Sequence, residues 1–176
     1  MILATVGTHE QPLDRLFVEL DRLVAAGEIT EEVVAQVGHS DFTSPRLTTH
    51  RMLPYDELQD ALGRARRVIT HGGPATIMQA FAVGKVPIVV PRQSAFGEHV
   101  DDHQVRFARR VADRCLVVLD IAELGPTLRE YEARVAALTG PPPGAGTAAE
   151  FAHAFEALCE DLLSGRRRRA RGLWPW

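Results

Sequence analysis

The feature that most limits the folds open to this chain is a regular alternation of short apolar runs with segments of helical periodicity. The run VPIVVP at 86–91 is apolar throughout, as in a strand buried on both faces of a sheet. Between residues 13 and 26, apolar side chains instead recur at helical spacing. The alternation predicts a single α/β domain, a three-layer Rossmann-like fold with a mostly parallel sheet of about six strands.

These patterns also place the individual elements. Strands are expected at 2–6, 32–38, 47–53, 67–70, 86–91 and 115–119, and helices at 13–26, 55–65, 75–83, 99–112 and 121–138. In an open parallel sheet, ligands bind beyond the carboxyl ends of the strands. The polar segments GTHEQ, HGGPAT and DDHQ each follow a strand, so we expect them to meet at one edge of the sheet.

Four segments are distinguished along the chain. Residues 1–138 hold the α/β pattern, and TGPPPGAG at 139–146 is a proline- and glycine-rich break that predicts a linker. Residues 147–164 follow with an amphipathic helical pattern, and 165–176 form a basic tail with two tryptophans. The apolar stripe of the expected helix consists of Phe151, Phe155, Leu158 and Leu162.

The charge is unevenly distributed. The chain has a formal net charge of -3, although five arginines lie within RRRRAR at 166–171. The remainder is therefore clearly acidic, which argues against general nucleic-acid binding, because duplex phosphates require a basic face. The tail could contact anionic lipid or be a solvated end, and its charge is compatible with both.

The sequence also bears on the cellular compartment. Cys115 and Cys159 lie far apart in apolar segments and lack a second ligand at metal-binding spacing, which favours buried thiols in a reducing cytoplasm. The opening MILATVGTHE has no basic region of a signal peptide, and no run of about 18 apolar residues is present. We therefore expect a cytoplasmic chain without a membrane span of its own.

The segment HGGPAT at 71–76 has the composition of an anion-binding turn. Gly72 and Gly73 let a ligand approach the backbone, and Pro74 suits the first position of a helix. The free N–H groups at the start of that helix favour an anion, with His71 and the Thr76 hydroxyl as further donors. A tight strand-to-helix turn with nothing bound would explain the two glycines equally well.

Known nucleotide motifs are absent from the sequence. It contains neither G-x-G-x-x-G after the first strand nor G-x-x-x-x-G-K-[ST], so NAD binding and a P-loop enzyme are not supported. Thr76 and Gln79 are three residues apart in a helical pattern and so share one face near its start. No D-x-D motif is present, and we expect neither a cofactor nor a bound metal.

Residues 68–108, VITHGGPATIMQAFAVGKVPIVVPRQSAFGEHVDDHQVRFA, resemble the C-terminal, donor-binding half of GT-B glycosyltransferases, in particular the family 28 C-terminal domain. That family includes the catalytic subunit of the dolichol-linked N-acetylglucosaminyltransferase. The blocks TVGTHEQPLDRL and PRQSAFGEHVDDHQ are more similar to a bacterial capsule and exopolysaccharide branch whose enzymes are split into two chains. The resemblance covers about residues 1–135.

This resemblance implies a UDP-sugar site built from three loops. The residues that match donor-binding positions are Gly7, Thr8, His71, Gly72, Gly73, Thr76, Gln79, Asp102, His103 and Gln104. His71, Gly72, Gly73 and Thr76 match the loop that holds the diphosphate. Gln79 replaces a glutamate that usually binds the ribose, and it can still accept through its carbonyl oxygen. Ala75 replaces a common glycine.

The implied reaction is transfer of a hexose with inversion. The helix start, Thr76 and His71 would stabilise the leaving diphosphate without a metal. His9 and His71 are the candidate catalytic residues, with His99 and Glu98 as further candidates to line the cleft. For His9, His99 and Glu98 the sequence favours a surface or supporting role over catalysis. His39, His50 and His153 show no constellation and are interpreted as structural or surface residues.

The acceptor half is expected on another chain. Split relatives act with a membrane-anchored acceptor-binding subunit on a lipid-linked sugar acceptor, which would hold this chain at the inner face of the cell membrane. Two alternatives remain open: a nucleotide-sugar-binding module without catalysis of its own, suggested by Gln79 and Ala75, and a nucleotide-sugar 2-epimerase, against which the length argues.

Overall fold

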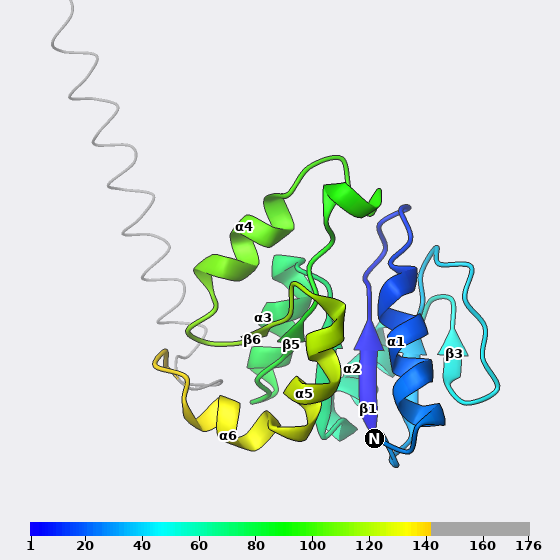
Figure 1. Cartoon of the computed structure of the whole chain (residues 1–176), viewed down its shortest axis with the longest axis horizontal. Helices are drawn as coiled ribbons and strands as arrows, with labels where there is room; N and C mark the ends of the chain where they lie inside the picture. Colours follow the sequence, from blue (N-terminus) through cyan, green and yellow to red (C-terminus); the bar gives the residue numbers. More distant parts are fainter. Residues whose placement is uncertain (142–176) are drawn as a thin grey trace, which may run out of the picture. The chain divides into compact units, whose positions relative to one another are not determined.

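Short runs of β-branched and other apolar residues form six strands of one parallel sheet (Figure 1). The structure is a computed structural model, and it describes residues 1–141. The strands are β1 Ile2–Thr5, β2 Val33–Gln36, β3 Thr48–His50, β4 Arg67–Thr70, β5 Ile88–Val89 and β6 Leu116–Val117. Their order is β3-β2-β1-β4-β5-β6, and every neighbouring pair is parallel, so the expected α/β fold is confirmed.

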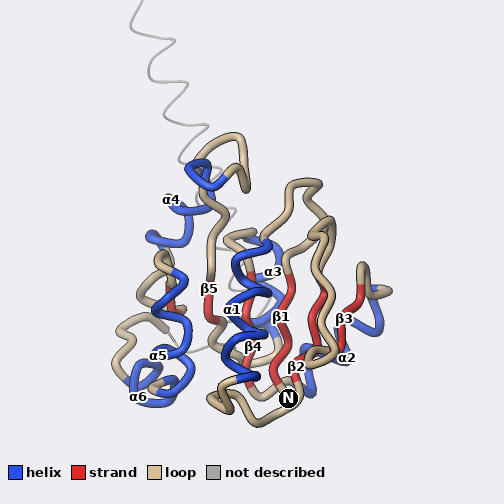
Figure 2. The backbone as a smooth tube through the Cα atoms, turned by 45° about the vertical axis from the view of Figure 1, so that its right-hand side comes forward, coloured by secondary structure: helices blue, strands red, loops and turns tan. Residues whose placement is uncertain are grey.

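Helices cover both faces of the sheet (Figure 2). They are α1 Asp14–Ala25, α2 Tyr55–Arg64, α3 Pro74–Ala82, α4 His103–Arg110, α5 Leu124–Arg129 and α6 Tyr131–Ala136, with 3-10 turns η1 Ser94–Phe96 and η2 Ile121–Glu123. Apolar side chains of α1, α5 and α6 pack on one face, and those of α2, α3 and α4 on the other. The result is the expected three-layer arrangement.

The central strand β1 shows how the sheet is buried on both sides. Ile2 and Ala4 pack in the cluster under α1, whereas Leu3 packs in the cluster under α2. Successive side chains of a strand point to opposite faces, so an unbroken apolar run is what a strand between two helical layers requires. All three side chains are buried.

Several elements are clearly shorter than the patterns predict. The strand β3 covers only 48–50 of the expected 47–53, and β6 covers only 116–117 of the expected 115–119. Pro87 and Pro91 flank β5 and cannot donate to the ladder, which limits that strand to two residues instead of 86–91. The helix expected at 99–112 begins only at His103. Before it, Gly97 adopts a positive φ of 70° after η1, and the chain forms a loop rather than helix.

The segment expected as one helix at 121–138 is divided into η2, α5 and α6. Glu130, at φ -96° and ψ 13°, separates α5 from α6 and changes the direction of the chain. The Tyr131 side chain is thereby buried, and its hydroxyl donates to the Val86 carbonyl oxygen at 2.6 Å. Helical periodicity alone does not reveal this break, because the apolar positions continue across it.

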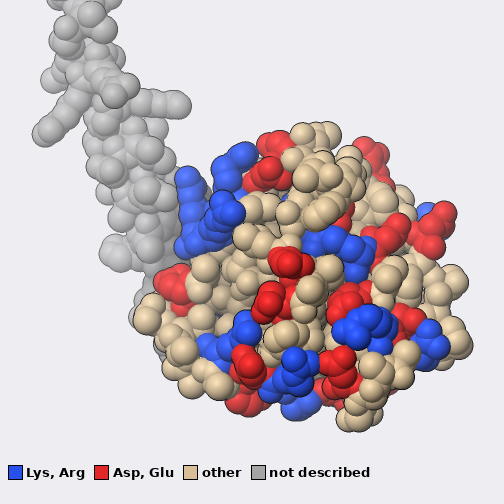
Figure 3. Space-filling view, in the orientation of Figure 1, with Lys and Arg blue, Asp and Glu red and all other residues tan. Residues whose placement is uncertain are grey.

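Charged side chains of both signs are interspersed on the face seen in Figure 3. Among the described residues, no helix has the length and apolar character needed to cross a bilayer. Cys115 is buried, and burial raises the pKa of its thiol to about 12, as expected for an inert thiol. The expected helix at 147–164, the tail at 165–176, His153 and Cys159 lie outside the described residues, as does most of the 139–146 linker.

Candidate functional site

The strand order reverses between β1 and β4, which are neighbours in the sheet although α1, β2, β3 and α2 separate them in sequence. The segment after β1 and the segment between β5 and α4 both extend beyond the same end of the sheet (Figure 1). The turn 71–73 also leaves the sheet there, after β4. The carboxyl edge at such a reversal is where open α/β sheets bind ligands, so the three polar segments do meet at one edge.

His71 lies buried in this edge between two glycines. A Cβ on Gly7 would approach the imidazole Cε1 to 2.6 Å, and a Cβ on Gly73 would overlap Nε2. Gly7 also has a φ of 68°, which side-chain-bearing residues rarely adopt. The glycines therefore make room for the imidazole of this chain, a role that the sequence pattern does not reveal.

Gly72 allows Gln104 and Pro91 to pack closely against the backbone of the turn. A Cβ there would lie 2.8 Å from the Cβ of Gln104 and 3.0 Å from that of Pro91. Gln104 is buried, and its Oε1 accepts the backbone N–H of Arg92 at 3.2 Å. The amide of Gln104 is thus fixed by the loop before α4, and among the described residues its Nε2 donates no hydrogen bond.

The start of α3 is arranged as the sequence predicts. Gly73 is the N-cap residue, Pro74 takes the first helical position, and no side chain caps the free N–H groups. Thr76 lies in the first turn and is 9% exposed, while Gln79 is half-buried one turn later. The uncapped N–H groups and the helix dipole favour a bound anion at this position.

Arg92 is a residue of the site that the sequence analysis missed. Its side chain is fully buried, an uncommon environment for arginine. The guanidinium donates to the carbonyl oxygens of Gln11, of Pro12 at 2.9 Å and of Val6 at 3.1 Å. A buried cation therefore ties the loop after β1 to the loop after β5. No local pattern identifies it, because its acceptors lie about 80 residues earlier.

Glu98 and Arg15 form an ion pair that also holds the loop after β5. Arg15 donates from Nε to Glu98 Oε1 at 2.7 Å and from Nη2 to the Pro91 carbonyl oxygen at 2.8 Å. The other carboxylate oxygen of Glu98 accepts the Gln93 N–H at 2.9 Å. Both oxygens of Glu98 are thus engaged in holding the loop, which leaves this carboxylate poorly placed to act as a base.

Asp102, His103 and Gln104 of the DDHQ segment have different environments. Asp102 is exposed, and its Oδ1 accepts the backbone N–H and the hydroxyl of Ser94, which lowers the pKa of its carboxyl. His103 is exposed and bonded to Asp101, whereas Gln104 is buried. Asp102 and His103 are therefore open to a ligand, and Gln104 is held in the interior of the loop.

His9 is held by the loop after β1. Its Nδ1 accepts the backbone N–H of Gln11 at 3.1 Å, so the neutral imidazole carries its proton on Nε2. Partial burial, together with His99 and Arg92, lowers the pKa of His9. In this geometry Nε2 is a hydrogen-bond donor, which suits contact with an anion better than removal of a proton from an acceptor.

His71 is neutral at physiological pH. Burial, followed by the nearby charge of Arg92, lowers its pKa to about 4. A group with that pKa is a weak base and is almost never an imidazolium at pH 7. A neutral imidazole has one N–H donor and one acceptor nitrogen, and Nδ1 lies 3.4 Å from the Thr70 hydroxyl oxygen, so His71 meets a ligand as an uncharged polar group.

The low pKa of His71 predicts a pH dependence of stability. Unfolded histidine takes up a proton near pH 6.5 while folded His71 does not, so the free energy of unfolding should fall as the pH drops from 6.5 toward 4, by roughly 3 kcal/mol. Urea titrations at several pH values test this, with His71→Asn as a non-titrating comparison. The prediction would be contradicted if the free energy of unfolding of the wild type and that of His71→Asn changed equally with pH between 6.5 and 4.5.

A cavity of about 540 Å³ lies elsewhere among the described residues. It is lined by residues of the β3 edge and α2, among them His50, Asp56 and Arg64. Asp56 is one of three acidic residues of α2 in this lining, with Glu57 and Asp60, and their charge makes the cavity a poor environment for a phosphate. The sheet reversal, where the three polar segments meet, is therefore the better candidate for an anionic ligand.

Comparison with known proteins agrees with this architecture. The chain aligns with the kitacinnamycin glycotransferase at 20% identity and a TM-score of 0.54, covering 77% of this chain and 34% of that one. It aligns with CalG4, the calicheamicin glycosyltransferase, at 20% identity and a TM-score of 0.53, covering 77% and 33%. The chain thus spans about a third of the length of these structures. No curated protein matches its sequence.

The fold is that of the C-terminal half of a GT-B glycosyltransferase. Residues 1–133 match the glycosyltransferase family 28 C-terminal domain, and the chain belongs to that family. The match confirms the resemblance at the level of the family and of the donor-binding domain.

Proposed function

We propose that this chain is the donor-binding, catalytic subunit of an inverting UDP-sugar glycosyltransferase. It transfers a hexose to a lipid-linked acceptor in polysaccharide biosynthesis. The observation that carries the proposal is the uncapped start of α3 at the strand reversal, next to neutral His71 and the buried charge of Arg92. This arrangement suits a nucleoside diphosphate, and family membership supports a nucleotide-sugar donor.

The site would stabilise the departing diphosphate with fixed charge. The charge of Arg92 lowers the pKa of both His71 and His9, so its field reaches both imidazoles. Helix N–H groups, the Thr76 hydroxyl and the donor nitrogens of these histidines then supply hydrogen bonds. Such preorganised donors stabilise a leaving group without a metal ion.

The other donor-binding residues are assigned to parts of the UDP-sugar according to the loop in which they lie. Gly7 and Thr8 would border the diphosphate, and Gln79 would accept from the ribose hydroxyls through its side-chain oxygen. Asp102 and His103 would offer their exposed polar atoms to the sugar. Gln104 would contribute through Nε2, since its Oε1 already accepts from Arg92.

In the reaction, an acceptor hydroxyl attacks the anomeric carbon while the bond from that carbon to the UDP oxygen breaks. The acceptor proton passes to a base, and the electron pair remains on the departing diphosphate. Within the described residues, His71 is neutral with a low pKa and His9 presents a donor. Both oxygens of Glu98 are engaged, and His99 Nδ1 accepts the backbone N–H of Asp101. We therefore propose that the acceptor-binding partner supplies the base.

The partner subunit is proposed to be membrane-anchored and to hold this chain at the inner face of the membrane. The blocks TVGTHEQPLDRL and PRQSAFGEHVDDHQ, similar to the split bacterial enzymes, support this. Phe96 and Val100, which are 62% and 82% exposed in the segment between β5 and α4, also support it. Apolar side chains at the rim of a site suit a covering protein.

Calorimetry with UDP tests the donor site. Thr76→Val should weaken UDP binding about fivefold to tenfold. A hydrogen bond to a charged group contributes about 1.5–3 kcal/mol, and water replaces part of this contribution in the variant. Gln79→Glu should tighten binding about fivefold, since a carboxylate is the stronger acceptor for ribose hydroxyls. His50→Ala, at an exposed position on β3, is the neutral control. Unchanged affinity in both site variants would contradict the assignment.

The alternative function is a nucleotide-sugar-binding module without catalysis. The replacements at Gln79 and Ala75 keep it open. Co-expression with a membrane-anchored partner distinguishes the two: transfer from a UDP-sugar only in the paired sample supports the enzyme, and UDP-sugar binding without transfer in any pairing supports the module.

A further inference from the structure

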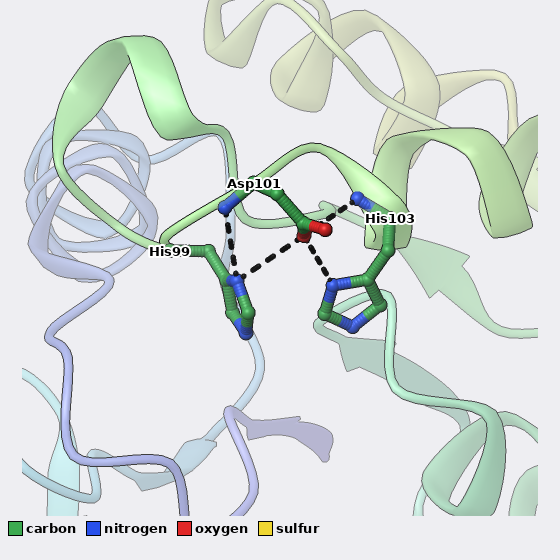
Figure 4. A group of neighbouring side chains, drawn as sticks. All are labelled: His99, Asp101 and His103. Atoms are coloured by element: carbon green, nitrogen blue, oxygen red, sulfur yellow. Dashed lines mark hydrogen bonds and ion pairs between the residues drawn. The ribbon is translucent and has the colours of Figure 1, made fainter.

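Next to the proposed donor site lies a cluster of two imidazoles and a carboxylate, from His99, Asp101 and His103 (Figure 4). One ligand-type atom from each residue lies within 4.8 Å of the others. Asp101 Oδ1 is 2.6 Å from His103 Nδ1 and 3.5 Å from His99 Nδ1. Figure 4 shows both Nδ1 atoms turned toward the same carboxylate oxygen.

We propose that His99, Asp101 and His103 bind a divalent transition-metal ion of the Zn²⁺ class. Two imidazoles with one carboxylate are a set that suits Zn²⁺ and its neighbours, whereas Mg²⁺ prefers oxygen ligands alone. Three protein ligands leave one position for water or another ligand. The metal site shares His103 with the proposed sugar contacts, so its test is made without nucleotide.

The spacing of the three atoms is compatible with one ion. With metal–ligand distances of about 2.0–2.1 Å, tetrahedral ligands lie roughly 3.3 Å apart. The contact from Asp101 to His99 is close to this value, and the contact to His103 must lengthen by less than about 1 Å. The exposed side chains of Asp101 and His103, at 50% and 47%, give an ion a path of entry.

Neighbouring groups orient the cluster. Arg106 Nη2 lies 3.5 Å from Asp101 Oδ2, which leaves Oδ1 facing the imidazoles. The His99 ring packs against His9, with centroids 4.5 Å apart, and against His103 at 4.4 Å. Such outer contacts fix the direction of metal-binding side chains.

The competing assignment is a hydrogen-bonded cluster that holds no ion. His103 is bonded to Asp101, and this contact is the first cause of the lowered pKa of the Asp101 carboxyl, about 2. An ionised Asp101 carboxylate can pair with a protonated imidazole, and it can equally coordinate a metal ion. Only a direct measurement of metal binding separates the two.

Calorimetry with Zn²⁺ alone, on the full chain prepared without a histidine tag and without nucleotide, tests the proposal. We expect one ion per chain, and we expect His99→Ala/His103→Ala to weaken its binding at least tenfold. Co²⁺ should give visible absorption bands that the same double variant loses. The matched control is His39→Ala/His50→Ala, which removes two exposed histidines that are distant in sequence from the cluster. This variant should bind Zn²⁺ as the wild type does.

Two results would overturn the site. One is absence of Zn²⁺ binding by the wild type, which would leave a hydrogen-bonded cluster. The other is equal affinity of the double variant and the wild type, which would place the ion elsewhere. Because UDP is absent from the measurement, a failure here would leave the donor-site proposal intact, and a failure of UDP binding would leave this one intact.

Discussion

Replacing Arg92 with alanine is expected to destabilise the fold by about 3–5 kcal/mol, a loss far above that of an ordinary surface substitution. The guanidinium is fully buried and donates to the carbonyl oxygens of Val6, Gln11 and Pro12. Its loss leaves these carbonyls without their donor and opens a cavity at the base of the site. Urea denaturation followed by circular dichroism measures the effect.

The matched control is Arg64→Ala, which removes an exposed pair between Arg64 and Asp60 on α2. An exposed i,i+4 pair contributes only about 0.3–0.5 kcal/mol. Arg92→Lys should not restore stability, because one ammonium cannot span carbonyls from separate positions as a planar guanidinium does. A loss below 1 kcal/mol in Arg92→Ala would show that the buried contacts contribute little.

Replacing Gly73 with alanine is expected to weaken UDP binding strongly while leaving a folded chain. The added methyl would overlap His71 Nε2, so the imidazole or the turn must move. The backbone of Gly73 has an ordinary φ of -77°, and the effect is therefore one of space rather than of backbone strain. We expect at least a tenfold loss of affinity, since misplaced donors no longer converge on one anion.

Gly63→Ala is the control for this substitution. Gly63 lies in α2 with no atom within 4 Å of the added Cβ, so alanine should stabilise the helix by about 0.5–1 kcal/mol and leave UDP affinity unchanged. Circular dichroism and thermal unfolding establish that the Gly73 variant is folded. Wild-type affinity in a folded Gly73→Ala protein would contradict the assignment of His71 to the diphosphate.

The two substitutions probe different parts of one arrangement. Arg92 fixes the loop after β1 against the loop after β5, and Gly73 fixes the space in which His71 meets the start of α3. A large effect of Arg92→Ala on stability with little effect of Gly73→Ala on stability would separate the support of the site from its binding surface.

The sequence predicted the fold well because its evidence is local. A buried strand such as β1 and an amphipathic helix such as α1 each carry their own periodicity, and Pro74 marks the start of α3. Predictions were poorer where distant contacts are involved, as at Glu130, where the expected helix is divided and the Tyr131 hydroxyl bonds to the Val86 carbonyl oxygen.

The candidate site divides in the same way. The place of the turn 71–76 at the sheet edge, and its proposal as an anion-binding turn, follow from residue types and from the topology that alternation implies. The neutral state of His71, the role of Gly7 and Gly73 in making room for its ring, and the function of Arg92 did not follow. These depend on groups brought together from across the sheet.

The sequence by itself thus determined the α/β layers, the position of the turn 71–76 at the sheet edge and the family. Tertiary structure alone decided which groups are buried, charged or free to donate, including the approach of His9 to His99. The physical reason is that secondary structure reflects periodicity within a few residues. Burial, desolvation and hydrogen bonding in the site arise between loops far apart in the chain, as between Val6 and Arg92, which are 86 positions apart.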